Sequence, residues 1–169
     1  MQTVQIQIMK KSTLKLPLTP TEKKNLRKNK SKITNIPNYS INELGTILEI
    51  SPERAKEIHA LAIFQQIPSI GIKFAEDLVF LGYFSLAALA DKDGAKLVEA
   101  YERKKSYWID SCVEDQFRLA VHYAKTKDTT KKWWDFTAER KAYRLENGYP
   151  ADRPTAAWHE VINLSSKRN

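Results

Sequence analysis

The stretch "IPSIGIK", residues 67–73, combines residue types that suit the binding of an oxyanion. Pro68 fixes the entry to a turn, and Gly71 can adopt a positive φ without cost. An apolar helical pattern follows directly, so the first unpaired N–H groups of that helix point outward from a turn without bulky side chains. These groups, with the amine of Lys73 beside them, favour a phosphate oxygen. The predicted phosphate contacts are Ser69, Ile70, Gly71, Ile72 and Lys73.

A second group of candidate residues lies in a basic segment near the N-terminus. The chain has 169 residues and a formal net charge of +8. Between Lys10 and Lys32 nine basic residues accompany one acid, Glu22, so this segment carries the whole excess of positive charge. A basic arm on a neutral body favours a polyanion, because each neutralised phosphate releases condensed counterions. The alternative is a solvated tail that only aids solubility. The predicted contacts of the arm are Lys23, Lys24, Arg27, Lys28, Lys30 and Lys32.

Composition argues against several other classes of protein. The lone Cys112 has no partner for an internal disulfide, and the three histidines are scattered without the spacing of metal ligands. No run is apolar enough for a membrane-spanning helix or a secretory signal. We therefore expect a cytoplasmic protein that has no membrane partner, needs no metal or cofactor, and is not an enzyme.

The elements that must position these residues are predicted to be helices. Capping boxes open the segments "TPTEKKNLRKNK" (19–30) and "SINELGTILEI" (40–50), and a serine cap followed by proline opens "SPERAKEIHALAIF" (51–64). Another helix follows the 67–71 turn and ends at Gly82. Apolar residues at helical spacing predict further helices within 93–105, 111–125 and 137–146. No segment alternates with a period of two for long enough to form a sheet, so we predict an all-α fold.

Two stretches of the chain repeat each other. A shift of about thirty residues places "IPNYSI" (36–41) over "IPSIGI" (67–72), which indicates an internal duplication.

The stretch "IPSIGIKFAEDLVFLGYFSLAAL" (67–89) resembles the helix-hairpin-helix motif. The usual core of that motif is a hydrophobic residue, Pro, Gly, a hydrophobic residue and Gly, followed by a helix with an early Ala. Ser69 departs from this pattern, because it stands where the first glycine usually lies. The resemblance implies that the hairpin amides bind the sugar-phosphate backbone of DNA without reading bases, and that two tandem copies form a compact, SAM-like helical core. The matching residues are Pro68, Ile70, Gly71, Lys73 and Ala75.

The upstream copy, "IPNYSI", has Asn38 and Ser40 in place of both glycines of the motif. We expect that copy to be structural.

Two further segments, "CVEDQFRLAVHYA" (112–124) and "KKWWDFTAERKAYRLENGYPADRP" (131–154), resemble a bacterial family named for a gene in a clostridial pathogenicity locus. That resemblance covers nearly the whole chain and implies helix-hairpin-helix content.

The predicted organisation has three parts: a basic arm with a short helix (1–32), a tandem helix-hairpin-helix domain (33–126) and a C-terminal helical extension (127–169). Two interpretations of Trp133 and Trp134 remain open, because such a pair can anchor the extension to the core or stack on exposed bases. We expect Arg140, Lys141 and Arg144 to form one solvated face of the last long helix.

These features predict sequence-independent binding of duplex or branched DNA, by an accessory factor that also has a protein partner. The alternative is an adaptor that binds a protein through the hairpin or the Trp133/Trp134 region. A third interpretation is a helix-turn-helix regulator with Arg54, Ala55 and Lys56 on its recognition helix. A fourth is a glycosylase-like enzyme, because Lys73 lies two residues after the final glycine of the hairpin and Asp91 some eighteen residues further on.

Overall fold

The structure is a computed structural model that describes residues 14–166. Helices make up its regular elements, as the sequence predicts, and within these residues the only strand-like feature is an isolated bridge between Trp108 and Ala157. The elements are α1 (Pro20–Lys28), η1 (Ile33–Asn38), α2 (Ile41–Leu48), α3 (Pro52–Phe64), α4 (Ile72–Phe80), η2 (Ala87–Leu89), α5 (Gly94–Lys105), α6 (Ser111–Thr126), η3 (Trp133–Phe136), α7 (Thr137–Asn147) and α8 (Trp158–Ser166).

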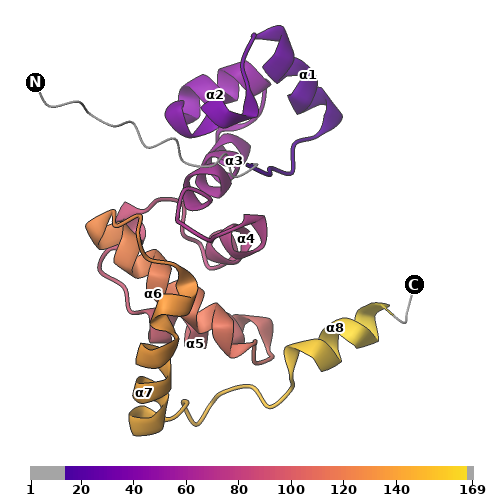
Figure 1. Ribbon diagram of the computed structural model, residues 1–169. Coiled ribbons are helices and arrows are strands. Elements are labelled where there is room, and N and C mark those ends of the chain that lie inside the picture. The colour runs from indigo at the N-terminus through magenta and orange to yellow at the C-terminus, as the bar shows by residue number, and fades with distance from the viewer. Residues whose placement is uncertain (1–13, 167–169) are drawn as a thin grey trace, which may run out of the picture.

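The helices follow one another from one end of the molecule to the other (Figure 1). Helices α1 and α2 form one end, α3 and α4 lie in the middle, and α5, α6 and α7 form the other end, while α8 extends away from the body. Because the regular elements are helices and the only bridge is isolated, the all-α prediction is confirmed for this part of the chain. Among the described residues, no helix is both long and apolar enough to cross a membrane.

Helix α3 is central because it contributes to both hydrophobic clusters of the molecule. The main cluster contains buried apolar residues from α3, α4, α5, α6, η2 and η3. The N-terminal cluster joins α1, α2 and α3 through Leu18, Leu26, Ile36, Leu44, Leu48, Ala55, Ile58 and Ala62.

The described part of the basic arm packs on this N-terminal cluster. The predicted capping box is present, since the Thr19 hydroxyl accepts a hydrogen bond from the Glu22 amide and the Glu22 carboxylate accepts one from the Thr19 amide. Leu26 is buried, and the side-chain amide of Asn25 donates to the carbonyl oxygen of Leu48 across 2.9 Å. Residues 14–32 are thus integrated with α2 and α3, whereas the domain boundary proposed at residue 32 remains a prediction.

The segment between Lys15 and Glu22 runs antiparallel to α3. At the C-terminal end of α3, the Gln65 side-chain amide exchanges two hydrogen bonds with the backbone of Lys15. At its N-terminal end, Arg54 pairs with Glu22 across 3.0 Å and donates to the Pro17 carbonyl oxygen. Arg54 and Gln65 are eleven positions apart, so the two anchoring points lie about 16 Å apart along the helix axis.

Helix α7 of the C-terminal extension is attached by ion pairs. Helix α7 has no buried residue, yet the Arg144 guanidinium bonds Glu114 on α6 at 2.9 Å and Glu99 on α5 at 3.0 Å. Arg140 bonds Asp115 on α6 at 2.7 Å. The expectation that Arg140 and Arg144 lie on a solvated face was wrong, because buried carboxylates require a charged partner and these two guanidiniums supply it.

A close approach of α5 to α6 at Gly94 gives a test of this packing. A Cβ at Gly94 would lie only 2.8 Å from the backbone nitrogen and Cα of Arg118. We expect Gly94→Ala to lower the free energy of unfolding by about 2 kcal/mol, because the backbone of α6 must shift. Urea unfolding followed by circular dichroism measures the change.

Gly45→Ala in α2 is the matched control. A Cβ there would make ordinary contacts at 3.5 Å or more, and alanine favours the helix interior. Its stability should equal or exceed that of the wild type. A Gly94→Ala protein as stable as Gly45→Ala would contradict the proposed close packing.

Candidate anion-binding site

The turn between α3 and α4, residues 65–71, carries the predicted phosphate contacts. Its apolar side chains fix it to the core, since Ile67 and Ile70 are buried in the main cluster. The Ile70 amide donates to the Ile67 carbonyl oxygen across 3.2 Å, so this amide is used inside the turn. Of the five predicted contacts, Ile70 is therefore the one whose amide is already occupied.

The residue with positive φ in this turn is Ser69, with φ of 62°. Gly71 has φ −106° and ψ −175°, an extended conformation that any residue adopts, so the turn does not use the freedom of Gly71 to take a positive φ. The Ser69 hydroxyl donates to the Pro68 carbonyl oxygen at 2.5 Å and accepts from the Trp133 amide at 3.1 Å. These two bonds stabilise Ser69 in a left-handed conformation, which otherwise favours glycine.

The first amides of α4 are open. Among the residues the structure describes, no acceptor bonds the amide nitrogens of Gly71, Ile72 or Lys73. A Cβ placed on Gly71 would meet no heavy atom within 4 Å, and Gly71 and Lys73 are exposed. Three amides at a helix start thus have no acceptor among the described residues, next to open space at Gly71 and with a lysine on the first turn.

The duplicated turn before α2 provides an internal comparison, because Ser40 caps α2 where Gly71 caps α4. The Ser40 hydroxyl accepts from the Glu43 amide at 3.2 Å, and the Glu43 carboxylate accepts from the Ser40 amide at 2.8 Å. The upstream turn therefore satisfies the Ser40 and Glu43 amides with side chains. Gly71 and Phe74 stand at the equivalent positions and have no such side chains, so the Gly71 amide lacks the acceptor that the Ser40 amide has.

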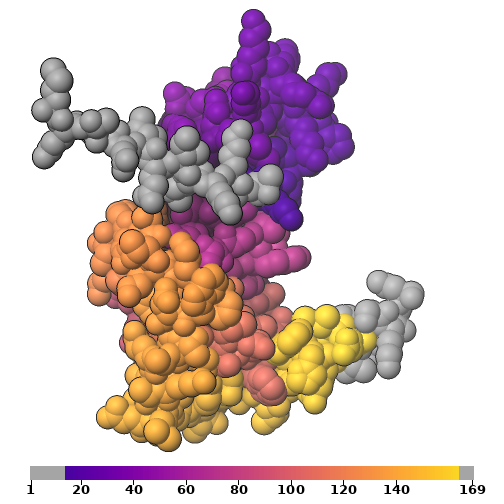
Figure 2. All heavy atoms as spheres, viewed as in Figure 1, coloured from indigo at the N-terminus to yellow at the C-terminus, as the bar shows by residue number. Residues whose placement is uncertain are grey.

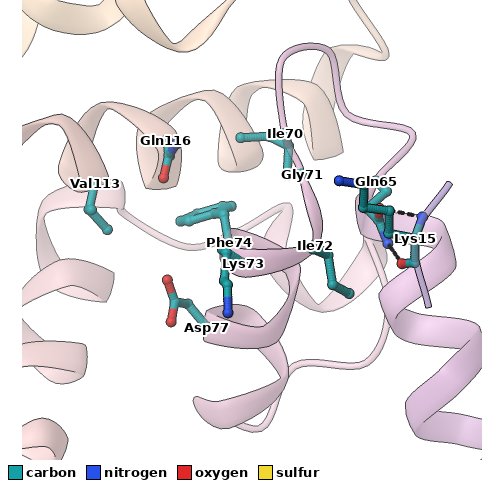
Figure 3. A pocket seen from close by; sticks show the side chains of 10 residues that line it. All are labelled: Lys15, Gln65, Ile70, Gly71, Ile72, Lys73, Phe74, Asp77, Val113 and Gln116. Carbon is teal, nitrogen blue, oxygen red and sulfur yellow. Dashed lines mark hydrogen bonds between the residues drawn. The ribbon is translucent and has the colours of Figure 1, made fainter. Parts of the chain in front are cut away.

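A pocket of about 520 Å³ opens beside the α3–α4 turn. Figure 3 shows Lys73 and Asp77 on successive turns of α4, with Gln116 and Val113 of α6 on the opposite wall. The remaining lining residues are Lys15, Gln65, Ile70, Gly71, Ile72 and Phe74.

Asp77 is the acidic group of this pocket. Burial raises the pKa of its carboxyl to about 6, although the hydrogen bond from the Tyr101 hydroxyl at 2.8 Å and the charge of Lys105 act in the opposite direction. Burial, followed by the charge of Asp77, also raises the pKa of the Tyr101 phenol. At neutral pH the ionised Asp77 therefore opposes an anion beside Lys73.

The six predicted basic contacts of the arm are all exposed. Lys28 pairs with Glu49 across 3.4 Å, and the other five form no ion pair with a described residue. They lie on or just after α1, at the end of the molecule that Figure 2 shows in indigo. The length of α3 separates the first of them from the α3–α4 turn, whereas Lys15 reaches the pocket itself. Sequence reasoning counted Lys15 among the basic residues but did not place it at the turn.

The two tryptophans of η3 have different environments. Trp133 packs against the main cluster, and the neighbouring Phe136 is 9% exposed. Trp134 is 54% exposed, with its ring edge-on to that of Trp133. The anchor interpretation therefore fits Trp133, while Trp134 leaves most of its ring in solvent.

The residues of the other two functional interpretations are placed differently. Ala55 is fully buried, Arg54 pairs with Glu22, and the Lys56 amine lies over the Phe84 ring. These contacts engage the α3 residues that a regulator would use to read DNA. Asp91 pairs with Lys92 on an exposed surface and does not line the pocket that contains Lys73. Within residues 14–166 no three His, Cys, Asp or Glu side chains converge as a metal site requires.

The raised pKa of Asp77 predicts a pH-dependent stability. The native state binds this proton more tightly than the unfolded chain, so stability decreases as pH rises from about 4 to about 6. Asp77→Asn keeps an acceptor for Tyr101 without the charge. We expect the variant to be about 1 kcal/mol more stable than the wild type at pH 7.5, with a smaller difference at pH 4.

Urea unfolding at the two pH values measures this difference. The control Asp91→Asn removes a carboxylate whose side chain is 79% exposed, and should change stability little at either pH. If Asp77→Asn raised the free energy of unfolding equally at both pH values, the negative charge of Asp77 would not be what destabilises the fold.

Comparison with known proteins places most of this site within one family. No curated protein and no solved structure matches the chain. A model of the Cdd1 family, described as "Pathogenicity locus", matches residues 57–142, which run from α3 through the α3–α4 turn to α7. That match covers half of the chain, and the chain therefore belongs to the Cdd1 pathogenicity-locus family.

Proposed function

We propose that the chain binds DNA without sequence preference, by holding backbone phosphate at the start of α4. The observation that carries this proposal is the set of open amides at Gly71, Ile72 and Lys73, of which the Gly71 amide is open where the equivalent Ser40 amide is bonded by Glu43. Backbone amides recognise phosphate and carry no base information, so such contacts position a nucleic acid without reading it.

In this proposal α3, the turn and α4 form the functional copy of a tandem helix-hairpin-helix, and η1, α2 and the residues around them form the structural copy. Ser69 takes the left-handed conformation at the first glycine position of the motif, with φ of 62°. Gly71 at the second glycine position leaves space for a phosphate oxygen, because nothing lies within 4 Å of an added Cβ.

Charge supports the same ligand. Lys73 and Lys15 border the pocket at the turn, and along α1 lie exposed cations that form no ion pair with a described residue. The arginines of the body behave differently, since Arg118, Arg140, Arg144 and Arg153 pair with the carboxylates of α5 and α6. Unpaired cations are thus present at α1 and at the α3–α4 turn, although exposed lysines on α6 and α7 and before η3 add others.

A second candidate is a protein adaptor, favoured by apolar side chains exposed on the C-terminal helices. Leu145 on α7 is 91% exposed and Val161 on α8 is 38% exposed.

The dependence of binding affinity on salt concentration distinguishes DNA binding from the adaptor function, because only phosphate binding releases condensed counterions. With about four phosphate contacts, DNA affinity should decrease about a hundredfold between 50 and 200 mM salt.

Substitution of Gly71 tests the turn directly. Gly71→Ser reproduces the capping residue of the upstream copy and should weaken duplex binding about tenfold, because its hydroxyl would accept from the Phe74 amide and occupy the space of a phosphate oxygen at the helix start. Gly71→Asp adds a negative charge and should weaken it further. Fluorescence anisotropy with a labelled duplex measures affinity, and circular dichroism should show unchanged helicity, since the space at Gly71 is open. Wild-type affinity of Gly71→Asp would exclude the turn as the phosphate site.

The cations of α1 are tested by the salt dependence of binding. Replacing Lys23 and Lys24 with glutamine should lower the slope of log affinity against log salt by about two, since each phosphate contact contributes nearly one unit. Lys141→Gln on α7 removes an exposed lysine far along the chain and should leave the slope unchanged. If the wild type, the Lys23/Lys24 double variant and Lys141→Gln showed equal salt slopes, α1 would not belong to the DNA interface.

A further inference from the structure

The exposed ring of Trp134 is not used by the proposed phosphate contact. Its neighbour Trp133 packs on the core, with the two ring centroids 5.4 Å apart and the planes at 81°. In this edge-to-face arrangement Trp133 supports Trp134 while 54% of the Trp134 surface stays in solvent. A supported, solvent-exposed indole offers an aromatic surface for a flat ligand.

The position of this ring is fixed relative to the α3–α4 turn. The Trp133 amide donates to the Ser69 hydroxyl across 3.1 Å, a bond between residues 64 positions apart. The Asp135 carboxylate accepts from the Lys132 amide at 2.8 Å, and Phe136 is buried, so η3 is held from both ends. Chain geometry then places the backbone of Trp134 within about 15 Å of the open amides at Gly71.

The charges around the ring suit a nucleic acid. Lys131 is exposed and forms no ion pair with a described residue, and Lys132 lies next to it. The carboxylates of Asp135 and Asp128 also lie nearby in sequence, but each accepts hydrogen bonds, from the Lys132 amide and from Thr130 respectively. Lys131 and Lys132 thus offer cations next in sequence to the two tryptophans.

We propose that Trp134 is a stacking site for an unpaired base of the DNA strand whose phosphate is held at the α3–α4 turn. The inference rests on the proposed function and specifies its substrate class as DNA with a single-stranded segment, such as a fork or a gap. Bases inside a duplex stack on each other, so only an unpaired base presents a free face to the indole. Every base has such a face, so stacking preserves sequence independence.

The test compares three DNA molecules of one sequence: a blunt duplex, a single strand and a forked duplex. Anisotropy titrations of the full chain at low salt should show tighter binding of the single-stranded and forked molecules. Trp134→Ala should weaken these two by roughly tenfold and change blunt-duplex affinity less than twofold. Trp134→Phe retains an aromatic face and should restore most of the preference.

Two control variants separate this inference from the proposed function. Leu145→Ala removes another exposed apolar side chain, on α7, and should leave all three affinities unchanged. Gly71→Asp should weaken binding of all three molecules, because they share the phosphate contact. If Gly71→Asp has this effect and Trp134→Ala leaves the preference intact, the stacking site is wrong and DNA binding at the turn stands. If the wild type binds none of the three, both proposals fail, and Trp134 is better explained as a contact for a protein.

Discussion

Four buried carboxylates impose the strongest constraint on this molecule. Glu99, Glu102, Glu114 and Asp115 are each at most 4% exposed, so each requires a cation or donors inside the fold. Arginines from α6 and the C-terminal segment supply them. Removing one arginine would leave a buried charge unpaired, which costs far more than losing an exposed ion pair. The ion pairs thus fix the segment after α6, and with it η3, against the α3–α4 turn.

The two related turns differ at the two positions that form a capping box. Both precede a helix that starts at the equivalent isoleucine, Ile41 in α2 and Ile72 in α4. The side chains of Ser40 and Glu43 accept from each other's backbone amides, whereas Gly71 and Phe74 at the equivalent positions have no side chain that can do so. A glycine cap costs a helix only a few tenths of a kcal/mol relative to serine, so the open site is retained at small expense to stability.

The sequence predicted local structure well, because the signals for helix starts are themselves local. The caps at Thr19, Ser40 and Ser51 and the stop after Phe80 occur where side-chain chemistry placed them. At the candidate site, the exposure of Gly71 and Lys73 was also predictable, since polar and small residues interrupt an apolar pattern there. Helix α6 starts at Ser111, as the apolar pattern over 111–125 predicted, and the side chain of Asp110 caps it.

The features that sequence did not predict depend on contacts between distant segments. Arg140 and Arg144 resemble a solvated face until Glu99, Glu114 and Asp115 are brought beside them by the packing of α5, α6 and α7. The left-handed conformation of Ser69 depends on a bond from Trp133, 64 positions away. The placement of Lys15 at the pocket likewise depends on the two hydrogen bonds between its backbone and the side-chain amide of Gln65, fifty positions along the chain.

The spacing set by α3 has a consequence for the length of any ligand. If phosphate binds at both the α3–α4 turn and the α1 surface, as we propose, a mononucleotide would occupy one of them and would not bridge the roughly 16 Å of α3 between Arg54 and Gln65. A polymer held at one point would present its next phosphates to the other at a high effective concentration. Two individually weak contacts would then reinforce each other only on a long chain, and the proposed interface would favour polymers over their monomers.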